Sequence, residues 1–333
     1  MVVGLALWAG MVCVCPAQAK ALVTIAAVGG NPPAMPTVVD HQERVGKVLE
    51  YWQEQLGKVL PHRPDLIVLP EACDRPGGME IPDQLAYFVV RKDQVRDYFA
   101  AVAREHRCYI AFGMKHQQPD GSFLNSAFLL DRQGRQAGVY HKNYPTVGEM
   151  AAGIRAADAV PIIETEFGRV ACAICFDLNF DELRLKVAAA RPDIILFLSM
   201  YHGGMVQSYW AYTCRAFFVG AMGQLETPCE IRNPLGEVLA TSTNYFNYTV
   251  ARVNLDARLV HLDENWEKLA ALKAKYGHEV SIDDPGRVGA VLVTSHHDTL
   301  RADAMLDEFD IERLDAYFDR TRAARQQPGN LLK

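Results

Sequence analysis

The sequence lacks the features that mark several classes of protein. Its eight cysteines are too few for a disulfide scaffold in 333 residues, and their spacing is irregular. It has no basic block, and 34 Lys and Arg against 40 Asp and Glu give a net charge of −6, so no nucleic-acid partner is expected. Internal repeats and low-complexity tracts are also absent. With 50% apolar and 22% charged residues, the composition is typical of a soluble globular protein and excludes disordered, collagen-like and coiled-coil chains.

Charge is also missing from the N-terminal segment, residues 1–19. Residues 2–14 are apolar, Pro16 interrupts them, and a small-x-small triplet ends at Ala19, which is typical of a secretory leader. No Lys or Arg precedes the apolar run, so a dispensable extension or a start codon placed too far upstream is the alternative. The leader predicts export to the periplasm or medium, whereas the unpatterned cysteines beyond it favour the cytoplasm. No other segment is long enough to span a membrane, so the mature chain is expected to have no span.

Beyond Lys20, short apolar runs alternate with longer amphipathic segments. The short runs predict strands, and apolar residues at helical spacing predict helices. The expected single strands are residues 22–28, 65–69, 108–113, 193–199 and 248–253. The expected helices are residues 41–60, 93–107, 181–190 and 205–218. The expected hairpins pair 123–130 with 136–142, 161–165 with 169–175, and 229–233 with 237–240.

This order of elements predicts an α/β fold. Strand–helix–strand units mixed with hairpins indicate mixed sheets, and two such sheets packed face to face with helices outside, an α-β-β-α sandwich, accommodate the elements. No linker or shift in composition divides residues 20–290, which we read as one domain. Residues 291–333 are expected to be a C-terminal extension with one helix, because Leu306, Leu314 and Phe318 belong to one helical stripe.

Three of the apolar runs end in a reactive side chain. Glu71 follows the strand LIVLP, Lys142 follows GVYH, and Cys175 follows VACAI. Sites in α/β sheets form at strand ends, so these side chains are expected to meet. Together they provide a thiol nucleophile, a carboxylate that transfers protons, and an ammonium that stabilises negative charge. A thiol needs a nearby base or cation; Lys142 is expected to favour the thiolate of Cys175, and Glu71 to accept the proton.

Each of these residues also has a purely structural reading. A strand-end Glu or Lys is usually solvated, and a cysteine in an apolar strand is usually core. Cys172 and Cys175 form a CxxC, but an odd separation within one strand puts the two thiols on opposite faces, which disfavours zinc binding or a redox pair. His296 and His297 lie in a polar segment and are expected to be solvated. We therefore expect no metal and no cofactor.

The segments around the three residues resemble the nitrilase superfamily of carbon–nitrogen hydrolases. They are LIVLPE (66–71), YHKNYPTVGE (140–149) and VACAICFDLNFDELR (170–184), in the family's order, within a resemblance that covers roughly residues 22–255. The resemblance implies the nitrilase-like α-β-β-α sandwich and a small-molecule substrate. It also implies a homodimer or higher homo-oligomer that pairs across helices near residues 206–219.

The resemblance also assigns roles to residues. Cys175 is the expected nucleophile, Glu71 the general base and acid, and Lys142 the group that stabilises the tetrahedral intermediate. The backbone N–H of Phe176 is the second oxyanion donor, and Glu149 helps to hold the lysine and the substrate.

Tyr201 and His202 are expected to contact the substrate, because in this family the loop that carries them borders the pocket. Phe176-Asp177 stands where nitrile-hydrolysing members usually have Trp-Glu, which favours the amidase-like branch. The predicted function is hydrolysis of a linear amide or N-carbamoyl compound through a thioester, with release of ammonia or an amine. The alternatives are a nitrilase, an acyltransferase using the same thioester, and a non-catalytic binding protein on this fold.

Overall fold

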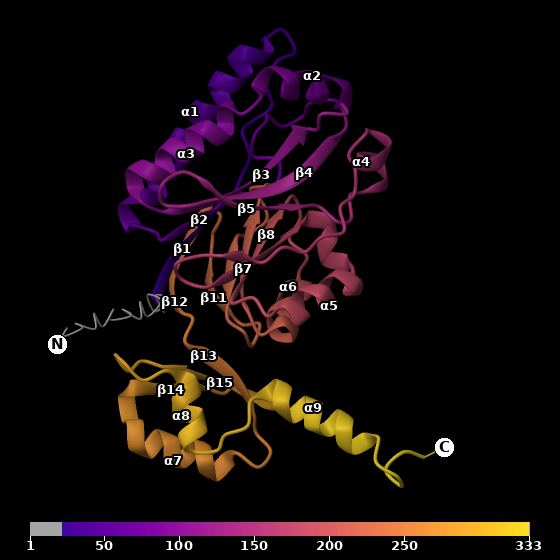
Figure 1. Cartoon of the computed structure of the whole chain (residues 1–333). Coiled ribbons are helices and arrows are strands. Elements are labelled where there is room, and N and C mark those ends of the chain that lie inside the picture. Colours follow the sequence, from indigo (N-terminus) through magenta and orange to yellow (C-terminus); the bar gives the residue numbers. More distant parts are fainter. Residues whose placement is uncertain (1–21, 333) are drawn as a thin grey trace, which may run out of the picture.

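The computed structural model describes residues 22–332. This part of the chain forms two six-stranded sheets that pack face to face and a three-stranded sheet nearer the C-terminus (Figure 1). The strands are β1 Leu22–Val28, β2 Leu66–Val68, β3 Tyr109–Gln117, β4 Phe123–Leu130, β5 Gln136–His141, β6 Ile163–Glu164, β7 Arg169–Ile174, β8 Ile194–Ser199, β9 Phe217–Met222, β10 Glu230–Arg232, β11 Val238–Thr241, β12 Tyr248–Asn254, β13 Ala257–His261, β14 Val280–Asp283 and β15 Ala290–Ser295. The helices are α1 His41–Val59, η1 Leu60–His62, α2 Ile81–Arg91, α3 Gln94–His106, α4 Val147–Ala151, η2 Cys175–Asn179, α5 Asp181–Ala190, α6 Met205–Cys214, α7 Trp266–Tyr276, η3 Gly277–Glu279, α8 Ala302–Glu308 and α9 Leu314–Arg325.

The first sheet has the strand order β12-β1-β2-β3-β4-β5. Strands β1, β2 and β3 are parallel, while the remaining neighbours are antiparallel, so the sheet is mixed. Its outer face is covered by α1 and α3, which bury apolar residues such as Trp52 and Phe99 against Ile110 and Phe112. The helical spacing of those apolar residues is what the sequence pattern detects.

The second sheet has the order β11-β10-β9-β8-β7-β6, with β7, β8 and β9 parallel. Helices α5 and α6 lie on its outer side, opposite α1 and α3 (Figure 1). The apolar core between the sheets joins residues of the first sheet, such as Ile25 and Val68, to residues of the second, such as Ala173 and Phe197. The expected α-β-β-α sandwich of two mixed sheets is therefore confirmed.

One expected helix, residues 205–218, is partly wrong. Helix α6 ends at Cys214, and Phe217 starts the buried strand β9 between β8 and β10. The helix stops because Arg215 adopts a left-handed conformation with φ of 57°. A continuous apolar run fits a buried helix and a buried strand equally well, so its periodicity alone could not separate them.

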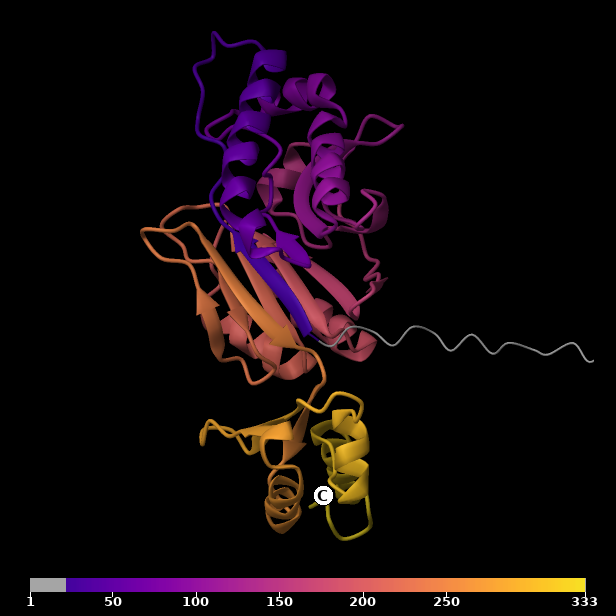
Figure 2. The same ribbon diagram turned by 90° about the vertical axis from the view of Figure 1, so that its left-hand side faces the viewer.

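The C-terminal region also differs from the expectation. Strands β13, β15 and β14 form an antiparallel sheet that packs against α7 and α8 around its own apolar cluster, with Val260, Leu272 and Met305 among its residues (Figure 2). Residues 291–333 were expected to hold one helix, but they hold two, α8 and α9. They also hold most of β15, which belongs to a sheet whose first strand, β13, begins at Ala257. The single stripe is divided because Asp310, with φ of 50°, interrupts the helix.

The N-terminal leader predicted for residues 1–19 lies outside the described residues. Within residues 22–332, no helix is both long and apolar enough to cross a bilayer.

Candidate functional site

Three strand ends of the sandwich place the predicted reactive residues. Glu71 lies three residues beyond the end of β2, and Lys142 follows β5 in the same sheet. Cys175 follows β7 in the facing sheet and is the first residue of η2. Both sheets therefore contribute to one polar site at the edge of the apolar core.

Lys142 is the centre of a buried hydrogen-bonded group, which we call the Lys142 cluster: Glu71, Asn125, Lys142 and Glu149. Its ammonium, on a side chain only 1% exposed, donates to Glu71 Oε1 and to Glu149 Oε2, each at 2.9 Å. Asn125 Nδ2 donates to the same two carboxylates, at 2.7 Å to Glu71 and 2.9 Å to Glu149. The two carboxylates are thus held close together by one cation and one amide, which offsets their mutual repulsion.

The charges of the cluster stabilise one another. Burial by itself lowers the pKa of Lys142, but the negative charges of Glu71 and Glu149 outweigh it and raise the pKa above its ordinary value. Burial opposes ionisation of Glu149, yet its contacts with Lys142 and the nearby Lys115 lower its pKa to about 2. At neutral pH the site therefore holds a permanent ammonium and a permanent carboxylate.

Glu149 is fixed by the start of the short helix α4. Thr146 caps this helix, with its hydroxyl accepting from the Glu149 N–H at 3.2 Å. The Glu149 carboxylate in turn accepts from the Thr146 N–H at 2.9 Å, completing a capping box. The local sequence TVGE therefore aims one carboxylate at Lys142.

The backbone of Glu71 is fixed by close approach to β3. A Cβ atom added at Gly113 would lie 2.5 Å from Glu71 Cα, so only glycine fits there. The Asn31 side chain holds the other side, with Nδ2 donating to the Glu71 carbonyl at 3.2 Å. Glu71 therefore has little freedom to move away from Lys142.

Cys175 has a strained backbone and a protonated thiol. Its φ of 47° is in the left-handed region, which is unusual for a residue other than glycine and recurs at functional sites. Burial and the negative charge of Glu71 raise the pKa of the thiol to about 12, against the opposing effects of Lys142 and of hydrogen bonds from the Met200 backbone and Ser199. Lys142 by itself favours the thiolate, as expected, but burial and the negative charge of Glu71 outweigh its effect.

Asp177 shapes the turn that carries Cys175. Its fully buried carboxylate accepts from Tyr140 Oη at 2.8 Å, from the Ile174 N–H at 2.9 Å and from the Tyr144 N–H at 2.8 Å. Burial outweighs these hydrogen bonds and raises its pKa to about 6. Asp177 therefore ties the Cys175 turn to the segment that carries Lys142.

The remaining predicted residues lie around this turn. Phe176, 37% exposed, stacks edge-on against Phe180. Tyr201 Oη accepts from Asn179 Nδ2 at 3.0 Å. His202 has both ring nitrogens engaged, one with Glu230 at 3.0 Å and the other with the Gly204 N–H at 3.1 Å. Substrate contact by Tyr201 and His202 stays a prediction.

Sequence reasoning missed Asn125 and the structural role of Asp177. The signal for Asn125 was present, because a polar Asn-Ser pair interrupts the otherwise apolar strand FLNSAFLL. The role of Asn125 depends on Glu71, which is 54 residues away in sequence. Asn125 lies on β4 and Glu71 follows β2, and β3 lies between these two strands in the sheet. Of the other cysteines, Cys172 is buried in the core between the sheets as expected.

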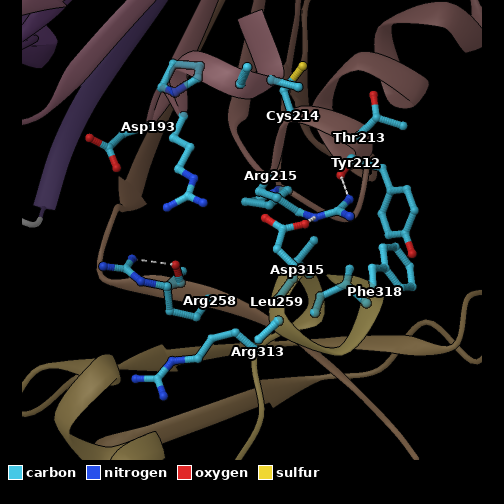
Figure 3. A pocket seen from close by; sticks show the side chains of 18 of the residues that line it. Asp193, Tyr212, Thr213, Cys214, Arg215, Arg258, Leu259, Arg313, Asp315 and Phe318 are labelled. Atoms are coloured by element: carbon cyan, nitrogen blue, oxygen red, sulfur yellow. Dashed lines mark hydrogen bonds and ion pairs between the residues drawn. The ribbon is translucent and has the colours of Figure 1, made fainter. Parts of the chain in front are cut away.

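One cavity of the described part of the chain lies away from the Lys142 cluster. It has a volume of ≈1150 Å³ and lies between the α5–α6 side of the sandwich and the C-terminal sheet (Figure 3). The arginines along it are largely paired; for example, Arg215 contacts Asp315 at 3.0 Å and Arg258 contacts Asp303 at 2.7 Å. A smaller cavity of ≈510 Å³, lined by Asn31, Met200 and others, adjoins the residues that hold Glu71 and Cys175.

Within residues 22–332, no group of three or more His, Cys, Asp or Glu side chains is arranged to hold a metal.

Comparison with known proteins identifies relatives. The family described as carbon–nitrogen hydrolase matches residues 24–222. A hydrolase of Schizosaccharomyces pombe is 22% identical over 160 residues, 46% of this chain and 50% of its own length. The deaminated glutathione amidase of Mus musculus is 26% identical over 165 residues, 45% of this chain and 51% of its own length. The chain thus spans about half the length of these relatives.

Solved structures share the fold. Saccharomyces cerevisiae Nit3, described as a member of branch 10 of the nitrilase superfamily, matches with a TM-score of 0.59 and 14% identity, over 71% of this chain and 91% of that one. An amidase from Nesterenkonia sp. matches with a TM-score of 0.60 and 16% identity, over 75% of this chain and 95% of that one.

Proposed function

Because the chain belongs to the carbon–nitrogen hydrolase family, we propose that it hydrolyses a linear amide or N-carbamoyl compound through a thioester on Cys175. Glu71 transfers the protons, Lys142 and the Phe176 N–H stabilise the oxyanion, and ammonia or an amine is released. The observation that carries the proposal is the Lys142 ammonium, buried and held at 2.9 Å from the carboxylates of both Glu71 and Glu149. A structural role alone would not require a buried ion cluster beside a strained cysteine.

The first half-reaction acylates the thiol. The Cys175 sulfur attacks the carbonyl carbon while its proton passes to Glu71, so no free thiolate has to accumulate; this agrees with the raised pKa of the thiol. The carbonyl oxygen becomes an oxyanion, which the Lys142 ammonium and the Phe176 N–H stabilise. Glu71 then returns the proton to the nitrogen, the carbon–nitrogen bond breaks, and ammonia or an amine departs.

The second half-reaction hydrolyses the thioester. Glu71 accepts a proton from water as the water oxygen attacks the acyl carbon, and the oxyanion forms again beside Lys142. The carbon–sulfur bond breaks, the acid product leaves, and the Cys175 sulfur recovers its proton from Glu71. Glu149 and Asn125 hold the ammonium and the Glu71 carboxylate in place throughout.

The Nesterenkonia amidase supports a covalent route by analogy. A mutant of that amidase was solved with the acetamide moiety of fluoroacetamide covalently added at its active-site cysteine. This chain shares the fold with it, and the proposal takes Cys175 as the corresponding residue.

The test combines intact mass with ammonia release over a panel of amides, N-carbamoyl compounds and nitriles. The wild type is expected to release ammonia and Cys175→Ala to lose about 10⁴-fold or more in rate. Glu71→Gln is expected to lose turnover because it can neither accept nor return the proton. Fluoroacetamide is expected to alkylate the Cys175 sulfur of the wild type: a carbon–sulfur bond forms, fluoride leaves, and the mass rises by one acetamide group.

The matched control is Cys172→Ala, which removes the neighbouring buried thiol and is expected to keep both turnover and the adduct. Full turnover in Cys175→Ala would refute the thioester. Turnover restricted to nitriles would replace the amidase assignment by a nitrilase.

A further inference from the structure

The smaller cavity, which we call the side cavity, adjoins the proposed reaction centre. Its volume is ≈510 Å³, and its lining includes Asn31, Arg75, Met200 and Glu226. Asn31 donates to the Glu71 carbonyl at 3.2 Å, and the Met200 backbone forms a hydrogen bond with Cys175. Asn31 and Met200 therefore contact both the side cavity and the residues of the proposed reaction centre, and the size of the side cavity suits a small molecule.

Two lining residues of the side cavity carry polar atoms without a partner. Arg75 Nε and Asn31 Oδ1 are both buried, and neither has a hydrogen bond within the described part of the chain. Buried polar atoms are nearly always hydrogen-bonded, because a buried group without a partner loses its bonds to water and gains none in return. One donor and one acceptor therefore stand unpaired in the residues that line the side cavity.

The charged residues that line the side cavity indicate which kind of hydrogen-bond acceptor a ligand would carry. Arg75 and Glu226 are the two charged lining residues, and Glu226 is exposed at the rim. No carboxylate lies within ion-pair distance of the Arg75 guanidinium in residues 22–332; Asp74, which attracts it, is paired with Arg91 at 3.1 Å. Arg75 Nη1 donates to the Pro76 carbonyl at 2.9 Å. A half-buried guanidinium with an unpaired N–H is suited to a carboxylate, which accepts from it with charge assistance.

We propose that Arg75 determines substrate specificity by binding a carboxylate at the far end of the substrate. The substrate class is then an amide or N-carbamoyl compound that carries a second, anionic end. This inference rests on the proposed function, since it takes the scissile carbonyl to lie at Cys175.

The test compares three amides that differ only at the far end: the monoamide of glutaric acid with a carboxylate, pentanamide with a methyl group, and 5-aminopentanamide with an ammonium. For the wild-type full chain, kcat/KM for the carboxylate is expected to exceed that for pentanamide about 100-fold, the order expected for a charge-assisted hydrogen bond. Arg75→Gln is expected to lose this advantage, and Arg75→Lys to keep part of it. Arg75→Glu is expected to reverse the preference towards the ammonium, which a misfolded variant could not do.

The control is Glu226→Gln, which removes the other charge of the side cavity and is expected to raise the preference for the carboxylate. Equal kcat/KM for all three amides in the wild type, or an unchanged preference in Arg75→Gln, would overturn the role of Arg75 while leaving the hydrolase intact. If the wild type hydrolyses none of the amides and forms no adduct with fluoroacetamide, the proposed function fails and this inference fails with it.

Discussion

At the scale of single residues, the site depends on polar groups placed where water is excluded. Lys142 is almost fully buried, and it keeps its charge because the carboxylates of Glu71 and Glu149 accept hydrogen bonds from its ammonium. Cys175 differs from Lys142, because burial and the negative charge of Glu71 favour its neutral form, the thiol. The two residues therefore start the proposed reaction in different charge states, and Glu71 links them.

Asp177 gives a prediction about pH and stability. Its pKa is raised to about 6 in the folded chain, so the folded state favours the protonated carboxyl. The stability that protonation provides is present below the ordinary pKa of about 4 and is lost as the pH rises through 6. The free energy of unfolding of the wild type, relative to Asp177→Asn, is expected to fall by about 2–3 kcal/mol between pH 4 and pH 7.

Denaturant unfolding of both proteins at pH 4, 5, 6 and 7 measures this difference. Asp181→Asn, which changes an exposed carboxylate on the neighbouring helix α5, controls for general effects of charge. A wild-type curve parallel to that of Asp177→Asn would contradict the raised pKa.

At the scale of elements, the site depends on strands that approach closely. The loop after β2 passes over β3, where Gly113 donates its N–H to the Pro70 carbonyl at 3.1 Å and accepts from the Cys73 N–H at 3.2 Å. These bonds hold the loop, and with it Glu71, against the sheet. A side chain on β3 at this position would push the two elements apart.

Gly113→Ala is therefore expected to displace Glu71. The added methyl group would lie 2.5 Å from Glu71 Cα and 2.8 Å from the Pro70 carbonyl oxygen, both backbone atoms that cannot rotate away. We expect a loss of about 1–3 kcal/mol in stability, as for overpacking, and a fall in turnover of at least about 10-fold.

The matched control is Gly57→Ala in α1, where a Cβ meets nothing within 4 Å. It is expected to stabilise the helix by up to about 1 kcal/mol and to leave turnover unchanged. Thermal unfolding and ammonia release measure both variants; wild-type turnover in Gly113→Ala would show that Glu71 does not depend on this contact.

At the scale of the whole molecule, the C-terminal sheet and helices form a unit beside the sandwich (Figures 1 and 2). The unit has its own apolar cluster, and a second cluster joins it to the sandwich, where Leu259 and Leu314 meet Leu235 and Tyr212. The ion pair of Arg215 with Asp315 lies beside this junction, along the large cavity of Figure 3. The junction is apolar at its centre and ionic at its edge.

Leu314→Ala is expected to loosen α9 without disturbing the site. Leu314 is 1% exposed, and removing a buried leucine costs about 2–5 kcal/mol at its position. Trypsin is expected to cut after Arg320, Arg322 or Arg325 of α9 sooner than in the wild type, while ammonia release stays within about 2-fold, because the Lys142 cluster lies in the sandwich. Leu331→Ala, at an exposed leucine, is the control, and an unchanged trypsin pattern in Leu314→Ala would contradict the anchoring role.

The sequence by itself determined the sandwich and the strand ends at which the candidate site residues lie. The ends of the strands can be predicted from the sequence, because each strand is a short apolar run whose pattern is local. The motifs around Glu71, Lys142 and Cys175 lie next to these ends. Only the tertiary structure decided what surrounds them. Asn125 and Asp177 gain their roles from partners that are distant in sequence, and the neutral state of Cys175 results from burial and from Glu71, which no single segment encodes. The C-terminal sheet likewise depends on the pairing of β13 with β15, whose partners are 29 to 37 residues apart in sequence, which a local pattern does not contain.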